Sequence, residues 1–340
     1  SLCYKKQSMR TKNLSVTRPS NSIIYQKVIS VLKKYKKNNR FVVGISGGPD
    51  SLALASITNL INKEKNYKFY FATVDHGIRK NSGNEAQKVK KILKSRKINI
   101  TILKNKIKIA NNIQKKAREV RYNLLANFCK KKNAKSLVVA HHQDDQVETF
   151  LIRLSRGSGV EGLSSMKEMT SLNNGIRLIR PLLDFRKIEL TRIAKKEFGK
   201  IIIDPSNKNK KFLRTNIRDL KKDLVNKGIN IERITRSIKN LALTKEAIDF
   251  YVAKSIKKFV SFQKKTTVLN LVKFKKEPQE IRFRIINNIV KKRSNSYYPP
   301  RSKKVLNLID GFQTNRIKKC TLGGCIFERK KSLLYVSKEL

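Results

Sequence analysis

The sequence predicts an α/β protein built on a doubly wound parallel sheet, because short apolar runs alternate with helical patterns along its first half. The apolar runs that read as buried strands are 41–45, 68–74, 98–103 and 136–140. Apolar residues recur at helical spacing over 21–36, 50–63, 82–97, 111–132 and 144–155. Strands that alternate with helices form right-handed crossovers, so the carboxyl ends of the strands share one edge, where ligands of such sheets bind.

The second half of the chain has a different pattern. Residues 184–198 and 214–262 read as mostly helical, and the remainder mixes helices at 278–292 and 302–309 with short strands within 317–337. A length of 340 residues allows two or three domains. The predicted parts are a flexible N-terminal arm (1–20), a catalytic domain (21–225), a helical linker (226–262) and a smaller C-terminal α+β domain (263–340).

The charge of the chain is strongly one-sided. Lys and Arg number 79 against 24 Asp and Glu, which gives a net charge of +55. A field of that strength attracts polyanions, and nucleic acid is the first candidate. Lys, Asn and Ile are all frequent, so an AT-rich coding bias is a second explanation for part of the excess. With 39% hydrophobic residues the chain can bury real cores, which argues against global disorder.

The four cysteines are few and irregularly spaced, which argues against a disulfide framework and indicates a reducing, cytoplasmic location. They are Cys3, Cys129, which is expected in a helix core, and Cys320 and Cys325, which read as apolar positions of a hairpin. No run of 18 apolar residues occurs and no apolar segment follows the basic N-terminus, so neither a membrane span nor a signal peptide is predicted. Because the chain begins at Ser1, a start further upstream stays open, as does assembly into a homodimer.

The segment Ser46-Gly47-Gly48-Pro49-Asp50-Ser51 lies between a predicted strand and a predicted helix. Its two glycines allow a tight turn that brings N–H groups to an anion, and the helix N-terminus adds partial positive charge. Ser46 and Ser51 can donate hydrogen bonds to phosphate oxygens, and Asp50 can hold Mg²⁺ or cap the helix. An ordinary strand–turn–helix connection is the alternative, which the complete six-residue string disfavours. The spacing is not that of a Walker loop.

Two further motifs carry weaker signals. The string Val74-Asp75-His76-Gly77-Ile78-Arg79 closes the second strand. Arg79 could meet phosphate there, and Asp75 or His76 could touch nucleotide or metal, although a plain turn is the simpler explanation. Arg118 and Arg121 share a helix face, where they repel each other unless an anion lies between them or Glu119 pairs locally. Taken alone, a solvated helix face is the simpler explanation for that pair.

A cluster of acidic residues follows the fourth predicted strand. The segment 140–149 holds two of the three histidines, His141 and His142, together with the carboxylates Asp144, Asp145 and Glu148. Asp145 and Glu148 are three residues apart on a helix, so they share a face and can recognise an ammonium group. In a chain with a net charge of +55, such a group indicates a site for Mg²⁺ or a cationic substrate. An acidic helix N-terminus would explain the two aspartates but not the histidines and the glutamate.

Later segments add loops and basic residues. A glycine-rich stretch at 156–163 is either a flexible connection or a mobile segment over the site, and short motifs follow at 180–183 and 204–207. Arg214 and Arg218 lie four apart on a predicted helix, which suits phosphate binding. The basic stretch 297–304 contains two tyrosines that could stack on bases, with a charged surface loop as the equal alternative.

In this order and spacing, the motifs over about 24–218 resemble the tRNA(Ile)-lysidine synthetase family of the N-type ATP pyrophosphatase-loop superfamily. The string S-G-G-x-D-S marks only the superfamily. The strings V-D-H-G-I-R, A-H-H-x-D-D-Q-x-E-T and R-G-S-G-x-x-G-L narrow the resemblance to the family. Ile78 stands where leucine is more usual. Lys211-Phe212-Leu213, directly before Arg214, departs from the family pattern.

The resemblance implies a sheet of the adenine nucleotide alpha-hydrolase-like type and a two-step reaction. ATP first adenylates the carbon-2 oxygen of the wobble cytidine in a tRNA(Ile) with a CAU anticodon, and pyrophosphate leaves. The ε-amine of free L-lysine then attacks carbon 2 and displaces AMP, which gives lysidine. The modified tRNA reads AUA instead of AUG. The region beyond 225 is implied to recognise the tRNA.

The resemblance also implies roles for individual residues. ATP is expected at the residues Ser46, Gly47, Gly48, Pro49, Asp50, Ser51, Asp75, His76 and Arg79, with Mg²⁺ at Asp50 and Asp144. The substrates are expected at Asp144, Asp145, Glu148, Arg118, Arg121, Arg214 and Arg218. Catalytic roles are expected for Asp50, Asp145, Glu148 and His141. The attacking amine must be neutral, and the sequence does not choose among His141, His142 and Asp50 as the base.

Two alternatives remain at this point. One is a tRNA 2-thiolation enzyme of the same superfamily, which often carries Cys-x-x-Cys pairs, and no such pair occurs here. The other is a non-catalytic RNA-binding protein on a decayed nucleotide fold. It would explain the charge but not the retention of Asp50, Asp145 and Glu148.

Overall fold

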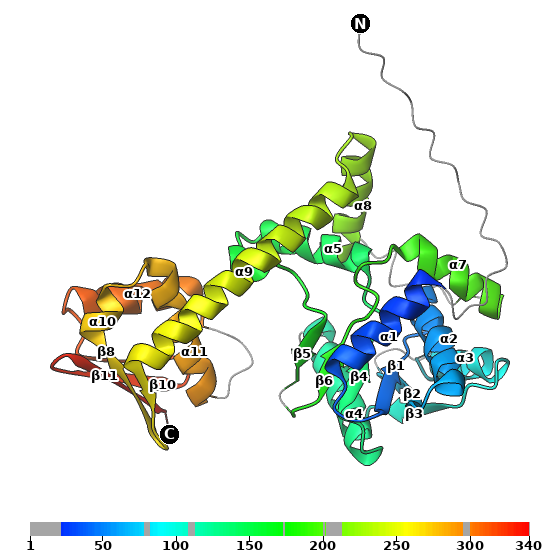
Figure 1. The fold of residues 1–340 in the computed structure, drawn as a ribbon, viewed down its shortest axis with the longest axis horizontal. Helices are drawn as coiled ribbons and strands as arrows, with labels where there is room; N and C mark the ends of the chain where they lie inside the picture. Colours follow the sequence, from blue (N-terminus) through cyan, green and yellow to red (C-terminus); the bar gives the residue numbers. More distant parts are fainter. Residues whose placement is uncertain are drawn as a thin grey trace, which may run out of the picture. The chain divides into compact units, whose positions relative to one another are not determined.

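The computed structural model describes residues 22–77, 82–107, 113–172, 174–199, 201, 213–294 and 300–339. The chain divides into two compact units, drawn in Figure 1. Unit 1 comprises Ser1–Gly157 and Ser165–Thr235, and unit 2 comprises Ser158–Ser164 and Arg236–Leu340. The division falls within helix α9 (Ile231–Phe259), inside the segment predicted as a helical linker. The predicted N-terminal arm lies outside the described residues.

Unit 1 is built on a six-stranded sheet within the described residues. Its strands are β1 (Arg40–Gly44), β2 (Lys68–Asp75), β3 (Ile100–Lys104), β4 (Ser136–Val138), β5 (Met169–Ser171) and β6 (Arg177–Ile179). They are ordered β3-β2-β1-β4-β6-β5, and every neighbouring pair is parallel except β5 with β6. The predicted parallel sheet is confirmed. The sequence patterns do not predict β5 and β6, because three-residue strands are too short to show a period.

Helices cover both faces of this sheet, as the doubly wound prediction requires. They are α1 (Ile23–Tyr35), α2 (Pro49–Glu64), α3 (Ser82–Lys94), α4 (Ile113–Lys131), α5 (Gln143–Leu154), α7 (Lys187–Phe198) and α8 (Leu213–Asn226). Along β1, Phe41 and Val43 join a core formed with α1, α2, α3 and α7. Val42 between them joins a second core with Leu125 and Cys129 of α4. Alternate residues of one strand therefore anchor opposite helical layers, which fixes the register of the strand.

Unit 2 contains a five-stranded antiparallel sheet in the order β7-β8-β11-β10-β9. Its elements are α6 (Val160–Leu163), β7 (Val260–Phe262), β8 (Thr266–Asn270), α10 (Leu271–Lys275), α11 (Gln279–Ser294), α12 (Ser302–Gln313), β9 (Lys319–Leu322), β10 (Cys325–Lys330) and β11 (Leu333–Lys338). Apolar residues of α9, α11 and α12 share one core with the inward residues of the sheet. The predicted α+β character is confirmed. The sequence pattern places β7 in the preceding helical region and does not predict β8.

The cysteines of the described residues are free and lie where the sequence predicts them. Cys129 is buried in α4, and Cys325 is buried at the start of β10. Gly323 forms the tight turn before β10 with a φ of +62°, and a Cβ there would lie 2.8 Å from Val290 Cγ1, so only glycine fits. Within the described part of the chain, no helix is long and apolar enough to cross a membrane.

Candidate active site

The loops that follow β1, β2 and β4 lie at one edge of the unit 1 sheet, because all three strands run parallel. The loop after β1 carries the predicted phosphate-binding string. Asp75 is the last residue of β2 and His76 begins the loop after it, and the loop after β4 carries His141 and His142. Three segments separated by about 30 to 65 residues in the sequence therefore contribute to one site.

The loop after β1 turns sharply and presents backbone N–H groups. Gly47 has a φ of +89°, a conformation that favours glycine, and Gly48 precedes the first turn of α2 with Pro49 at its start. The Ser51 hydroxyl oxygen accepts hydrogen bonds from the N–H groups of Ser46 (3.2 Å) and Gly47 (3.1 Å). It donates to the Gly48 carbonyl at 2.9 Å. Two N–H groups thus converge on one oxygen position, which is the arrangement a phosphate oxygen requires.

His142 lies among three carboxylates. Its Nε2 is 3.4 Å from Asp50 Oδ2 and 3.5 Å from Asp145 Oδ2, and its Nδ1 is 3.8 Å from Asp144 Oδ2. Burial disfavours the charged imidazole, but the hydrogen bond to Asp50 and the charges of Asp145, Asp50 and Asp144 outweigh it and raise the pKa of His142. The second oxygen of Asp50, Oδ1, is buried without a hydrogen-bond partner among the described residues.

Arginines of α8 meet the acidic side chains of α5. Arg214 donates from Nη2 to Asp145 Oδ1 at 2.7 Å and from Nε to Glu148 Oε2 at 2.7 Å. Arg218 Nε donates to the other Glu148 oxygen at 2.8 Å. Burial favours the neutral form of Glu148, but the two arginines outweigh it and lower the pKa of its carboxyl, so Glu148 is ionised. The sequence identifies these acids and arginines separately, and the structure pairs them.

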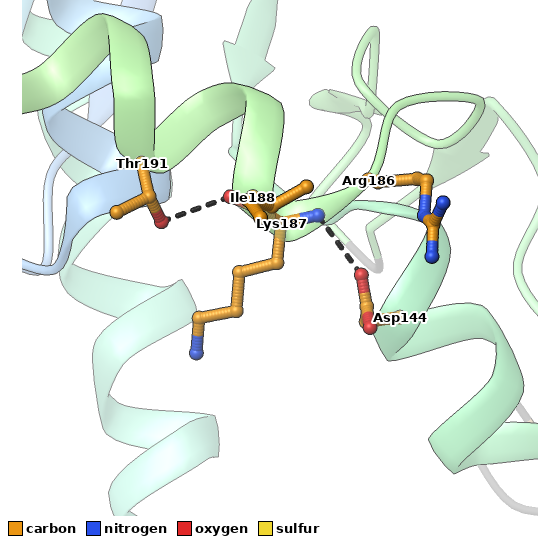
Figure 2. A pocket seen from close by; sticks show the side chains of 5 residues that line it. All are labelled: Asp144, Arg186, Lys187, Ile188 and Thr191. Carbon is orange, nitrogen blue, oxygen red and sulfur yellow. Dashed lines mark hydrogen bonds between the residues drawn. The ribbon is translucent and has the colours of Figure 1, made fainter. Parts of the chain in front are cut away.

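The Asp144 carboxylate accepts hydrogen bonds from lysines and not from the arginines that bind Asp145 and Glu148. Its Oδ1 accepts from Lys221 Nζ of α8 at 2.6 Å, and its Oδ2 accepts from the backbone N–H of Lys187 at 2.9 Å. Figure 2 shows the second contact beside a shallow pocket lined by Asp144, Arg186, Lys187, Ile188 and Thr191. Lys221 is not among the predicted site residues, because one lysine in a lysine-rich helix gives no signal in the sequence.

His141 faces a different environment from its neighbour. Burial, followed by the charges of Arg180, Arg118, Arg121 and Arg214, holds the pKa of His141 well below its usual range. Its Nδ1 is buried without a hydrogen-bond partner in the described part of the chain. The two adjacent histidines therefore have opposite protonation preferences: His141 is neutral, and His142 is stabilised as the cation.

Asp75, the last residue of β2, stabilises the segment that follows the strand. Asp75 Oδ1 accepts hydrogen bonds from Gly77 N (3.1 Å) and Ser82 Oγ (2.6 Å). Burial and the charge of Arg121 lower the pKa of His76, with Asp75 opposing the shift. Arg79 and the motif at 204–207 lie outside the described residues, as does part of the tyrosine-containing stretch at 297–304.

The glycine-rich stretch spans the point where the chain passes from unit 1 to unit 2. Residues Ser158–Ser164 belong to unit 2, where Glu161 accepts hydrogen bonds from Lys245 Nζ at 2.6 Å and Arg284 Nη1 at 2.9 Å. The chain returns to unit 1 at Ser165, whose hydroxyl donates to the Gln146 carbonyl of α5 at 3.1 Å.

Across the described ranges, no three His, Cys, Asp or Glu side chains are grouped so that they could hold a metal ion. The His142 imidazole lies between Asp50 and Asp145, and both oxygens of Asp144 accept hydrogen bonds. Among these residues, a metal site made of protein ligands alone is therefore not formed. The unpartnered oxygen of Asp50 can still contribute one ligand to an ion that phosphates and water complete.

The fold and the loop define the class of the protein. The PP-loop domain family matches residues 20–224, which is the greater part of unit 1. A solved structure, the U34-tRNA thiolase NcsA from Methanococcus maripaludis, shares the fold with a TM-score of 0.53 at 20% identity, over 64% of this chain and 77% of that one. The protein is thus an ATP-binding PP-loop protein.

Relatives of known name give the family within that class. The chain is 37% identical to the tRNA(Ile)-lysidine synthase of Wolbachia pipientis wMel, over 89% of this chain and 71% of the relative. It is 31% identical to that of Orientia tsutsugamushi (90% and 71%) and 33% identical to that of Zymomonas mobilis (78% of each). The chain belongs to the tRNA(Ile)-lysidine synthase family, which confirms the resemblance carried by its motifs.

Proposed function

We propose that this protein uses ATP to ligate L-lysine to carbon 2 of the wobble cytidine in a tRNA(Ile) with a CAU anticodon. The observation that carries the proposal is the meeting of a phosphate-binding loop with a buried acid–arginine network at one sheet edge, in a chain of this family. The carbon-2 oxygen of the cytidine attacks the α-phosphorus of ATP and pyrophosphate leaves. The ε-amine of lysine then forms the new C–N bond and AMP leaves with the oxygen.

ATP phosphates are proposed to bind the loop after β1. The N–H groups of Ser46 and Gly47 now point at the Ser51 hydroxyl, and a phosphate oxygen can take that position when Ser51 rotates away. Mg²⁺ would neutralise phosphate charge, and Asp50 supplies the free carboxylate oxygen that fits it. Asp144, predicted as a second metal ligand, has both oxygens engaged and would first have to release Lys221 or the Lys187 N–H.

Free lysine carries one carboxylate and two amino groups, so its binding site needs both acidic and basic side chains. The network of Asp145, Glu148 and Arg214 offers acids for an ammonium group and a guanidinium for the carboxylate. In the present structure the arginine satisfies the acids itself. A bound lysine ammonium would replace part of that contact, and Arg214 would then be available to the lysine carboxylate.

The attacking amine has to lose a proton before it forms the bond. Three carboxylates surround His142 and stabilise its protonated form, so His142 has the environment of a proton acceptor. Buried His141, surrounded by arginines, is suited to accept a hydrogen bond but not to gain a charge. The proposal therefore assigns proton acceptance to His142, while a catalytic role for His141 stays a prediction.

Several wider assignments are part of the same proposal. Unit 2, together with the basic residues around 297–304, is proposed to contact the tRNA. Arg118, Arg121 and Arg218 are proposed to contact substrates, with ATP also near Asp75, His76 and Arg79. A cytoplasmic location and assembly as a homodimer stay predictions that rest on the sequence.

A 2-thiolation reaction gains no support from the described cysteines. Burial raises the pKa of the Cys129 thiol to about 12, which disfavours the thiolate that sulfur chemistry needs. Cys320 and Cys325 lie in the sheet of unit 2, and burial raises the pKa of both. A non-catalytic RNA-binding role leaves the buried acids of α5 without a purpose, because a site for RNA phosphate does not need carboxylates.

The test is an incorporation assay with Mg²⁺, labelled ATP, labelled lysine and a tRNA(Ile) transcript with a CAU anticodon. The expected result is ATP-dependent lysine label in the tRNA, which is lost when the anticodon cytidine is replaced. A tRNA that becomes adenylated but gains no lysine would refute lysine as the nucleophile and leave the adenylation step standing. No transfer of either label would favour the RNA-binding alternative.

A further inference from the structure

The amino edge of the unit 1 sheet, which lies opposite to the candidate active site, is lined by basic side chains. Strands β1 to β4 run parallel, so the segments that lead into them meet at this edge. These segments are residues 33–40, 65–68, 94–99 and 130–136, and they are rich in Lys and Arg and contain neither Asp nor Glu. Four stretches that are distant in sequence therefore form one cationic edge.

The register of the sheet places four of these cations in a row. Arg40 and Lys68 are register partners at the starts of β1 and β2. Lys135 directly precedes β4, on the other side of β1, and Lys97 lies shortly before β3, beside β2. All four residues are exposed. Neighbouring strands are about 4.8 Å apart, so this amino-edge row (Lys97, Lys68, Arg40 and Lys135) is roughly 14 Å long.

Carboxylates do not neutralise the amino-edge row. Within the described ranges, none of its four side chains forms an ion pair. In contrast, Lys27 and Lys34 of α1 both contact Glu168, at 3.2 and 3.5 Å. Like charges on directly opposite residues of neighbouring strands are destabilising, so the pair of Arg40 and Lys68 costs stability in the free protein. An anion bound along the row would offset that cost.

Helix C-termini explain only part of the charge at this edge. Lys33, Lys63, Lys94 and Lys130 lie in the last turns of α1, α2, α3 and α4, where the helix macrodipole stabilises a cation. The amino-edge row lies at the strand starts, outside these helices. The macrodipole therefore does not account for it.

Two half-buried tyrosines hold lysines of this edge in place. Lys68 Nζ and Lys132 Nζ lie 5.9 and 5.2 Å from the centroid of the Tyr70 ring. Lys36 Nζ lies 5.6 Å from the centroid of the Tyr67 ring. These cation–π contacts restrict long side chains that would otherwise lose rotamer freedom when a ligand binds. The edge is thus partly ordered in advance, unlike a run of lysines that is free in solvent.

We propose that the amino-edge row binds the phosphate backbone of a second RNA molecule, separate from the tRNA at the catalytic edge. A row of cations suits consecutive phosphates whatever the base sequence. Strand β2 is 8 residues long, so the two edges are roughly 25 Å apart, and the RNA segment bound here is not the one that presents a base to the loop after β1. A lipid surface fits less well, because the described residues of these segments include no exposed large apolar side chain to insert into it.

The test compares two triple variants of the full chain, each of which loses three positive charges. The edge variant is Arg40→Gln, Lys68→Gln and Lys135→Gln. The control variant changes exposed lysines on the helices that cover the sheet, namely Lys88→Gln in α3 with Lys195→Gln and Lys196→Gln in α7. The probes are an oligouridylate over a range of salt, the tRNA(Ile) transcript with a CAU anticodon, and phosphatidylserine vesicles. Unfolding temperatures at low salt check that both variants fold.

The edge variant is expected to bind oligouridylate about tenfold more weakly, and the slope of its log affinity against log salt is expected to fall by about two. The control variant stays within about threefold of the wild type. At low salt the wild-type protein binds two tRNA molecules per chain and the edge variant binds one, while lysine transfer at saturating tRNA is the same for both. The unfolding temperature of the edge variant is no lower than that of the control, because a like-charge pair is removed.

Equal weakening by the two variants overturns the proposal, since the effect would then follow from net charge alone. A loss of vesicle binding with unchanged binding of oligouridylate overturns RNA as the occupant. One tRNA per chain in both the wild type and the edge variant overturns a second RNA molecule. The proposal does not depend on the proposed reaction: if the wild-type protein transfers no lysine but the edge variant alone loses RNA affinity and one bound tRNA, the surface stands and the proposed function fails.

Discussion

The two units each contain a network of buried charges, and the two networks are built in opposite ways. In unit 1 the acidic side chain is buried and its cationic partner reaches solvent. The Glu148 side chain is 4% exposed, and the side chain of its partner Arg214 is 40% exposed. In unit 2 the cationic side chains are buried and their acidic partners reach solvent. Arg284 and Lys245 are 6% and 9% exposed, and their shared partner Glu161 is 65% exposed.

This difference indicates which network can exchange a partner. A buried carboxylate must keep a positive charge beside it, but an arginine that already reaches solvent can leave if another cation replaces it. The acids of unit 1 can therefore accept a substrate ammonium group. In unit 2 the buried Arg284 is bound by Glu161, Asp249 and Glu280 at 2.8–3.0 Å, which fixes α6, α9 and α11 together. We interpret the first network as a binding site and the second as a structural one.

The largest expected effect is that of Glu148→Gln on lysine transfer. The change removes a buried negative charge that two arginines and, in the proposal, the substrate amine require, at a cost of about 2–4 kcal/mol. That corresponds to a loss of roughly 30- to 1000-fold in the rate of lysine incorporation at subsaturating lysine. The rate of tRNA adenylation, measured as pyrophosphate release, should change much less. An equal loss in both steps would contradict a lysine-binding role for this side chain.

Arg284→Gln tests the structural network and should act on stability instead. The variant leaves Glu161, Asp249 and Glu280 without one shared partner, but these acids reach solvent and Lys245 remains, so we expect a loss of about 1–3 kcal/mol. Denaturant unfolding monitored on unit 2 measures it. Lysine transfer per folded molecule at low temperature should be within about twofold of the wild-type value. A large loss of turnover with unchanged stability would reverse our interpretation of the two networks.

The pH dependence of lysine transfer should report His142. Since its pKa is raised above the usual value of about 6.5, the rate should fall as pH decreases through that raised pKa, because the protonated imidazole cannot accept a proton. The stability contribution of His142 has the opposite sense: it is complete below pH ~6.5 and is lost as pH rises through the folded-state pKa. In His142→Asn both dependences should disappear. A rate profile with an unchanged acidic limb would exclude His142 as the proton acceptor.

The smallest effect is expected from Glu161→Gln. Its carboxylate is largely exposed, so solvent screens its contacts with Lys245 and Arg284, and Asp249 still binds both cations. We expect a loss of about 0.5–1 kcal/mol in the stability of unit 2. Raising the salt concentration should reduce the difference between this variant and the wild type. A loss as large as that of Arg284→Gln would show that the acid, and not the buried cation, controls the network.

Much of the fold and part of the site could be predicted from the sequence. The alternation of strands and helices over the first 155 residues indicates the parallel sheet, because a helix of several turns shows a period of 3.6 and a strand buried on both faces shows a continuous apolar run. The short strands β5 and β6 show no such period, and β7 and β8 follow a long helical pattern without a clear break. The loop at 46–51 is predictable because its glycines and hydroxyls act within six consecutive residues.

What the sequence by itself determined is therefore local: the strand–loop–helix order, the phosphate-binding loop, the acids of α5 and the family to which these motifs belong. The tertiary structure decided which charges meet. Arg214 lies 66 residues from Glu148 and 69 from Asp145, and their pairing depends on how α8 returns to α5. Likewise, only the packing of α4 and the loops against one sheet edge gives His141 and His142 opposite protonation preferences. Electrostatic interactions depend on distance in space and on burial, and neither quantity is encoded in the spacing of residues along the chain.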